Sequence, residues 1–130
     1  MAKIKIIDDD VELAEDLAVI LRNAGHQVSV RDDTDGAVTE LLERKPDLLI
    51  LDVMFPANPA GGFDLAREIR GTPAIKDLPV ILLTAINQEF PMDFSSQDID
   101  ADWMPVQDFL EKPVAADTLL EKVDRFLRKQ

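Results

Sequence analysis

Apolar residues recur along the chain with two alternating periodicities. Short aliphatic runs of strand length alternate with longer stretches in which apolar residues lie three and four positions apart. The short runs predict strands at Ile4–Ile7, Gln27–Val30, Leu48–Leu51, Val80–Leu83 and Asp108–Leu110. The longer stretches predict helices at Val11–Ala24, Thr34–Arg44, Phe63–Arg70 and Ala116–Leu127.

This alternation predicts an α/β fold, a doubly wound, five-stranded parallel sheet with helices on both faces. Three of the predicted strands are continuous apolar runs, as expected of parallel strands buried on both sides. With 130 residues, 46% of them hydrophobic, the chain fits a single domain, residues 1–130. The stretch from Ile86 to Gln107 has two prolines and little helical periodicity, so the bounds of any short helix within it cannot be predicted.

Charge and residue usage exclude several classes of function. A formal net charge of -12 argues against direct binding to nucleic acid or to an anionic membrane, because both need a basic patch. No apolar run approaches the roughly 20 residues that cross a bilayer, and the first residues lack a signal-peptide cleavage site, so a cytoplasmic location is expected. Without cysteine, and with one histidine, the sequence leaves oxygen ligands for a metal, and these favour hard cations.

Polar side chains with useful chemistry follow the predicted strands. They are Asp8, Asp9 and Asp10 after the first strand, Asp52 after the third, Thr84 after the fourth and Lys112 after the fifth. The carboxyl ends of parallel strands share one edge of a sheet, so we expect these groups to meet there. Gathered carboxylates repel one another unless a cation lies among them, and Mg²⁺ suits such an oxygen-rich site. With a hydroxyl and an ammonium group to bind phosphate oxygens, the set describes phosphoryl transfer to a carboxylate.

Four motifs at these strand ends resemble those of the receiver domains of two-component response regulators. They are IKIIDDD, LLILDVMFP, VILLTA and FLEKPV, in this order, and the resemblance covers nearly the whole chain. It implies a flavodoxin-like, receiver-type fold and a phosphorylation-dependent signalling switch in a bacterial phosphorelay. Such a domain accepts a phosphoryl group from a sensor histidine kinase, with Mg²⁺, and then changes its partner-binding surface.

The resemblance also implies a phosphoacceptor and its metal ligands. Asp52 matches the aspartate that takes the phosphoryl group. Asp8 and Asp9 match the acidic pair that binds Mg²⁺, and Asp10 could support the site. Asp52 and the backbone carbonyl of Met54 match the remaining protein ligands of the metal.

Further residues match the groups that respond to the phosphoryl group. Thr84 matches the switching hydroxyl, Lys112 the phosphate-binding amine and Phe109 the aromatic side chain that moves on activation. Met54 and Ile86 match positions beside the path of water toward the phosphoryl group, and both are apolar. Because neither side chain can act as a base or orient water well, we expect slow hydrolysis of the phosphorylated form.

The implied partners are proteins. A sensor histidine kinase or a phosphotransfer protein is expected as donor and an unidentified downstream protein as target, without direct contact to nucleic acid or membrane; a homodimer is left open. The chain is not expected to be an enzyme acting on other substrates, because its only expected chemistry is phosphoryl transfer to Asp52 and slow hydrolysis from it.

Two alternatives stay open. A degenerate receiver would act only as a protein-interaction module, although every principal site residue is present. A haloacid-dehalogenase-like phosphatase also uses a strand-end aspartate, but it needs an acid two residues further on, where this chain has Met54. The chain also departs from the receiver pattern in two segments that are longer than usual, PANPAGGF after Asp52 and the segment between Thr84 and Lys112.

Overall fold

The computed structural model of the protein describes residues 2–32, 36–52, 61–84, 108–111 and 114–128. The elements are, in order, β1 (Lys3–Ile7), α1 (Val11–Asn23), β2 (Gln27–Arg31), α2 (Ala37–Glu43), β3 (Leu48–Asp52), α3 (Gly61–Arg70), β4 (Val80–Thr84), β5 (Asp108–Glu111) and α5 (Ala116–Arg128). Every strand and helix expected from the periodicities is therefore confirmed. No helix in these ranges is both long and apolar enough to cross a membrane.

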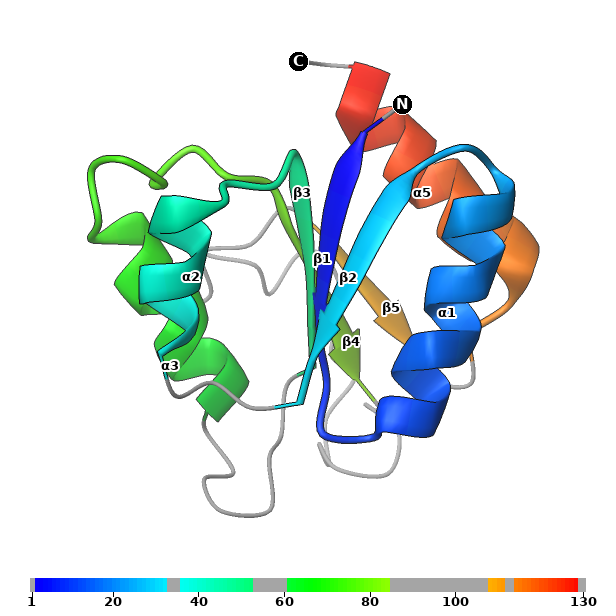
Figure 1. Cartoon of the computed structure of the whole chain (residues 1–130), viewed down its shortest axis with the longest axis horizontal. Helices are drawn as coiled ribbons and strands as arrows, with labels where there is room; N and C mark the ends of the chain where they lie inside the picture. The colour runs from blue at the N-terminus through cyan, green and yellow to red at the C-terminus, as the bar shows by residue number, and fades with distance from the viewer. Residues whose placement is uncertain (1, 33–35, 53–60, 85–107, 112–113, 129–130) are drawn as a thin grey trace.

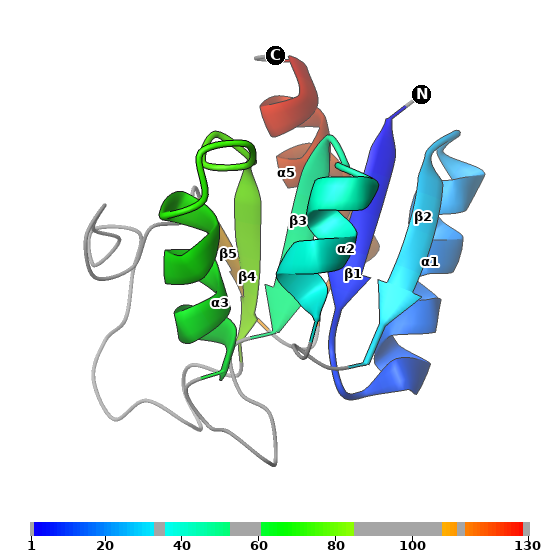
Figure 2. The ribbon, with the colours of Figure 1, turned by 60° about the vertical axis from the view of Figure 1, so that its left-hand side comes forward.

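The five strands form one sheet in the order β2-β1-β3-β4-β5. All four neighbouring pairs are parallel. Figures 1 and 2 show α1 and α5 covering one face of the sheet and α2 and α3 covering the other. The chain passes from β1 to β2 on one side and then back to β3 on the other, so the strand order reverses beside β1. The predicted doubly wound parallel fold is confirmed, and its reversal point is where ligands bind in such sheets.

Strand β3 is the centre of the core. All five of its residues, Leu48 to Asp52, are buried. Leu49 and Leu51 pack in the cluster on the α2 and α3 side, and Leu48 and Ile50 pack in the cluster on the α1 and α5 side. Each such aliphatic side chain stabilises the fold by about 1.5–3 kcal/mol. Because both faces are packed, the position of Asp52 at the end of this strand is fixed by the core.

Helix α2 begins later than the sequence predicts. The expected start was Thr34, but the described helix begins at Ala37 after Gly36, whose φ of +72° is left-handed. A residue in that conformation cannot continue a right-handed helix, and glycine adopts it without steric cost, so the predicted start is wrong. A Cβ at Gly36 would also lie 3.4 Å from the Arg31 guanidinium, so glycine leaves room for that side chain.

Other bounds differ from the predicted ones by one or two residues. Helix α1 ends at Asn23, one residue early, and Gly25 behind it has a φ of +99°, as expected of a left-handed residue after a helix. Helix α3 begins at Gly61 rather than Phe63. The stretch from Ile86 to Gln107 lies outside the described residues, so its predicted lack of clear periodicity stays untested.

Candidate acidic site at the strand ends

The carboxyl ends of β1, β3 and β4 meet at one edge of the sheet. Ile7 of β1 pairs with Leu51 of β3. Asp8 follows Ile7 and Asp52 follows Leu51, so the two aspartates lie side by side at the ends of these strands. Asp52 in turn pairs with Leu83, directly before Thr84. The parallel register therefore brings together strand ends that are far apart in the sequence, as we expected.

Three carboxylates gather at this edge. One oxygen each of Asp8, Asp9 and Asp52 lies within 4.8 Å of the others. Asp8 is fully buried and Asp52 is 5% exposed, whereas Asp9 is open to solvent. Two buried carboxylates beside a third repel one another in a poorly screened environment, and a cation among them removes that repulsion.

Local backbone geometry fixes the orientation of Asp8. Its N–H donates to the carbonyl of Arg31, 3.0 Å away at the end of β2. Its Oδ1 accepts the N–H of Asp10 at 2.9 Å. These two hydrogen bonds hold the Asp8 carboxylate at the point where the chain leaves β1 for α1.

Asp10 has a different role from its two neighbours. It is the N-cap of α1, and its Oδ1 accepts the N–H of Leu13 at 3.1 Å. An aspartate cap satisfies a helix N–H that otherwise lacks a partner and typically contributes about 1 kcal/mol. Asp10 is not among the three clustered carboxylates, so it supports the site through its backbone hydrogen bond to Asp8 rather than as a ligand.

The donor set fits a hard divalent cation. Three carboxylate oxygens close enough to contact one ion, with one of the residues at the solvent boundary, match the preference of Mg²⁺ for a few carboxylates and several waters. Asp8, Asp9 and Asp52 are the described residues that could hold it. The predicted carbonyl ligand of Met54 lies outside the described residues.

The remaining predicted residues lie around this edge or outside the described residues. Thr84 is the last residue of β4, and Phe109 lies in β5, where its backbone pairs with that of Leu82. Lys112 would follow directly after Glu111, which pairs with Thr84, but it lies outside the described residues. The structure thus places the backbone of Thr84 on β4, the strand next to Asp52, and the backbone of Phe109 on β5, one strand further out.

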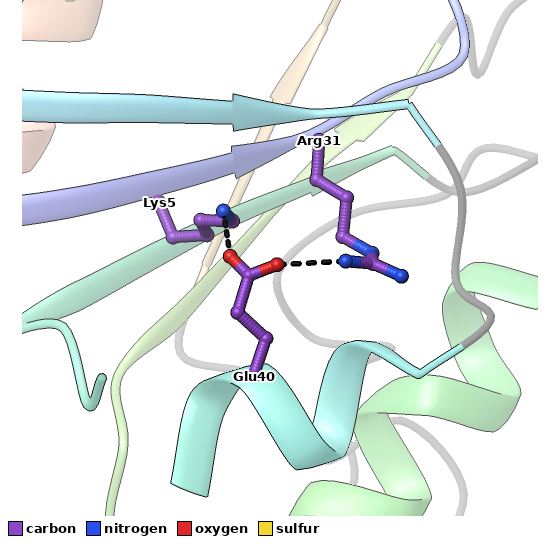
Figure 3. A network of polar contacts seen from close by, with 3 residues as sticks. All are labelled: Lys5, Arg31 and Glu40. Atoms are coloured by element: carbon purple, nitrogen blue, oxygen red, sulfur yellow. Dashed lines mark hydrogen bonds and ion pairs between the residues drawn. The ribbon is translucent and has the colours of Figure 1, made fainter. Parts of the chain in front are cut away.

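An ion-pair network beside the site was not predicted from the sequence. Figure 3 shows the Glu40 carboxylate of α2 between Lys5 of β1 and Arg31 of β2, with Arg31 Nη1 2.7 Å from Glu40 Oε1. The hydrogen bond from Lys5, followed by that from Arg31, holds the pKa of Glu40 below its usual range despite partial burial. The sequence signal is Lys5 itself, a buried lysine between two isoleucines of a core strand, which requires an acidic partner.

Replacing Glu40 with glutamine is expected to lower the free energy of unfolding by about 1 kcal/mol at pH 7, because the buried Lys5 loses its counter-charge while solvent still screens part of the network. The pKa of Glu40 is lowered from 4.5 on folding, so its stabilisation is present above that pH and is lost as the pH falls below it. Urea unfolding at a series of pH values should therefore show the difference between the two proteins shrinking in acid.

The matched control for this prediction is Glu121→Gln. Glu121 pairs with Arg125 on the exposed surface of α5, at 3.1 Å, so its loss should cost no more than about 0.5 kcal/mol. An equal effect of the two substitutions, or a Glu40→Gln effect that does not change with pH, would contradict the role assigned to the network.

The chain is similar to known proteins over nearly its whole length. Residues 4–124 match the family described as the response regulator receiver domain. The phosphate regulon transcriptional regulatory protein PhoB of Pseudomonas aeruginosa is 32% identical over 126 residues, which are 97% of this chain and 52% of PhoB. The chain spans about half the length of the curated relatives it matches.

Solved structures give the same picture of the fold. The receiver domain of NtrX from Brucella abortus superposes with a TM-score of 0.78 at 28% identity, covering 98% of this chain and 99% of that one. The chemotaxis response regulator CheY4 of Vibrio cholerae superposes with a TM-score of 0.78 at 25% identity, covering 97% of this chain and 98% of that one. Both similarities extend over almost the entire chain.

Proposed function

The chain belongs to the response regulator receiver domain family of two-component signalling systems, and on that premise we propose that it is a phosphorylation-dependent switch with Asp52 as phosphoacceptor. Its membership confirms the resemblance drawn from the four strand-end motifs. The observation that carries the proposal is the cluster of Asp8, Asp9 and Asp52, whose carboxylate oxygens lie within 4.8 Å of one another. Residues 1–130 are proposed to form a single receiver domain.

The proposed reaction forms one bond and breaks one. A carboxylate oxygen of Asp52 attacks the phosphorus of a phosphohistidine, the new O–P bond forms, and the N–P bond breaks with its electron pair left on the imidazole. The packed strand β3 holds this nucleophile at the sheet edge without a mobile linker, which keeps its orientation suitable for in-line attack. A Mg²⁺ ion bound by Asp8, Asp9 and Asp52 would neutralise charge that develops on the phosphoryl oxygens.

Thr84, Lys112 and Phe109 complete the proposed switch. The Thr84 hydroxyl and the Lys112 ammonium would bind phosphoryl oxygens, and Phe109 would move as the strand ends adjust. Phosphorylation would shift a pre-existing equilibrium between two conformations. The size of the shift equals the free energy by which the phosphoryl group stabilises one conformation more than the other. The proposed donor is a sensor histidine kinase or a phosphotransfer protein, and the proposed target is a downstream protein or a second copy of the chain.

Intact-mass spectrometry after incubation with acetyl phosphate and Mg²⁺ tests this function. The switch predicts one phosphoryl group per chain, whose incorporation is lost when EDTA removes the metal. No adduct would indicate a module that only binds a partner. Rapid, continuing hydrolysis of phosphate esters without a stable adduct would indicate a phosphatase, and either result would overturn the proposal.

The phosphorylated form is expected to be long-lived. Met54 and Ile86 are apolar and cannot position water, so replacing them together by asparagine and glutamate should accelerate loss of the phosphoryl group by roughly 10- to 100-fold. The decay of labelled protein in excess Mg²⁺ measures this rate. The apolar pair Met54→Leu with Ile86→Val is the control and should decay as slowly as the unmodified chain; equal decay of all three proteins would show that these side chains do not set the lifetime.

A further inference from the structure

The face of the sheet that α2 and α3 cover is apolar at its centre and polar at one edge. Beneath α3, strands β3 and β4 present Leu49, Leu51, Val80 and Leu82 to the core. In the first part of β1 and β2 the residues in register on that face are polar, with Lys3 opposite Gln27 and Lys5 opposite Ser29, whereas Ile7 near the other end of β1 packs in the core. Their neighbours Ile4, Ile6, Val28 and Val30 pack on the other face, against α1 and α5. The polar strip is thus a property of one face and not of the strands as a whole.

A cavity of about 570 Å³ lies over this polar strip. The first residues of β1 and β2, the inner side of α2 and the connection from α2 to β3 line it, and Leu41 and Pro46 are buried behind this lining. Its volume is in the range of roughly 300–1,000 Å³ that small-molecule sites occupy. Lys3 and Gln27 begin their strands, whereas Asp8 and Asp52 follow or end theirs, so the cavity faces the end of the sheet opposite the acidic cluster.

The charge of the cavity differs in sign from that of the protein. Four of the chain's 14 basic residues line it, namely Lys3, Lys5, Arg44 and Lys45, against two acidic residues, Glu40 and Glu43, in a chain with a net charge of -12. Glu40 is already neutralised, because both Lys5 and Arg31 bind its carboxylate. Basic groups gathered in a concave wall raise the local concentration of anions.

The cations at the mouth of the cavity are available to a ligand. Lys3, Arg44 and Lys45 are exposed, and within the described part of the chain their side chains make no ion pair. The hydroxyl of Ser29 and the amide of Gln27 lie on the same wall and can donate hydrogen bonds to an oxyanion. Charge-assisted hydrogen bonds of this kind are about twice as strong as neutral ones.

From these features we propose that the cavity between α2 and the start of β1 and β2 binds a small organic anion, a carboxylate or phosphate group joined to a compact apolar body. The anionic group contacts the charged ends of Lys3, Arg44 and Lys45, and the apolar body lies along the aliphatic parts of these exposed side chains. This site is separate from the proposed phosphoacceptor.

Titration of the full chain in metal-free buffer, followed by amide chemical shifts, tests the site with three probes. Benzoate carries both a carboxylate and an apolar ring, inorganic phosphate carries the anionic group alone, and benzyl alcohol is the neutral counterpart of benzoate. We expect benzoate to shift the amides of Lys3, Ser29 and Lys45 in a saturable way, and benzyl alcohol to leave them unchanged. Saturable shifts with phosphate at the same amides would show that the site accepts a phosphate group. Saturable shifts with benzoate but not with phosphate would show that it accepts a carboxylate only.

The double variant Lys3→Gln with Lys45→Gln should bind benzoate about tenfold more weakly, as expected when charge-assisted contacts are lost. Lys76→Gln is the matched control, since Lys76 is an exposed lysine that does not line the cavity, and it should bind as the unmodified chain does. An unchanged amide spectrum away from the substitutions verifies the fold of each variant. Equal affinity of the double variant, shifts spread over all exposed lysines, or equal binding of benzyl alcohol would overturn the proposal.

Discussion

Asp52→Asn is expected to abolish phosphoryl uptake from acetyl phosphate while leaving the fold intact. Asparagine has the shape of aspartate and fits the same buried position at the end of β3, which is 5% exposed. Its amide is uncharged and lacks the anionic oxygen that attacks phosphorus, so no acyl phosphate forms. Intact-mass spectrometry should show no phosphorylated species under conditions in which the unmodified chain is labelled, and the far-ultraviolet circular dichroism should be unchanged.

The control for this experiment is Asp16→Asn. Asp16 is an exposed carboxylate of α1 outside the acidic cluster, so its substitution removes the same charge from the protein without touching the site. It should be labelled at the rate of the unmodified chain. Labelling of Asp52→Asn at that rate would contradict the assignment of Asp52, whereas a loss of labelling in both variants would trace the effect to net charge.

The second large effect is expected on Mg²⁺ affinity. Removing the carboxylate of Asp8 or Asp9 takes one of three anionic oxygens from a cluster within 4.8 Å, and we expect either alanine variant to bind Mg²⁺ roughly 10- to 100-fold more weakly. Asp9→Ala is the cleaner test because Asp9 is exposed, while Asp8 is buried and its loss also leaves a void. Calorimetric titration with Mg²⁺ alone measures both affinities.

Asp10→Asn separates ligand loss from a general loss of charge. Asparagine caps a helix about as well as aspartate, so α1 should be retained, and the variant loses a carboxylate only one residue from Asp9. Because Asp10 is not in the cluster, Mg²⁺ affinity should change less than about threefold, as screening at an exposed position weakens its field. Wild-type affinity in Asp9→Ala, or an equal loss in Asp10→Asn, would contradict the proposed ligand set.

The fold could be predicted because local pattern and tertiary burial agree along most of the chain. Strand β3 is the clearest case, since its aliphatic run is buried on both faces. The prediction was wrong at the start of α2, where the tolerance of glycine for a left-handed conformation decided the bound at Gly36. A glycine inside a helical pattern costs about 1 kcal/mol, too little for sequence alone to tell an interruption from a tolerated residue.

The candidate site also has parts that the sequence predicted and parts that it did not. The meeting of Asp8, Asp9 and Asp52 followed from the rule that parallel strands have their carboxyl ends at one edge of the sheet, so the sequence was sufficient to predict it. The cap formed by Asp10 follows a known preference for aspartate before a helix, but three adjacent aspartates do not reveal which of them is the cap. The Lys5–Glu40–Arg31 network joins two strands and a helix, and its partners depend on packing that no local pattern encodes.

Locating the phosphoryl group within the chain tests the central claim most directly. Borohydride reduces an aspartyl phosphate to homoserine and leaves free carboxylates unchanged, so the labelled residue can be read by tandem mass spectrometry of peptides. After treatment with acetyl phosphate and Mg²⁺, homoserine is predicted at position 52, and it should be absent when Mg²⁺ is withheld. Homoserine at another aspartate, or a labelled protein that yields none, would contradict the assignment of Asp52 as the phosphoacceptor.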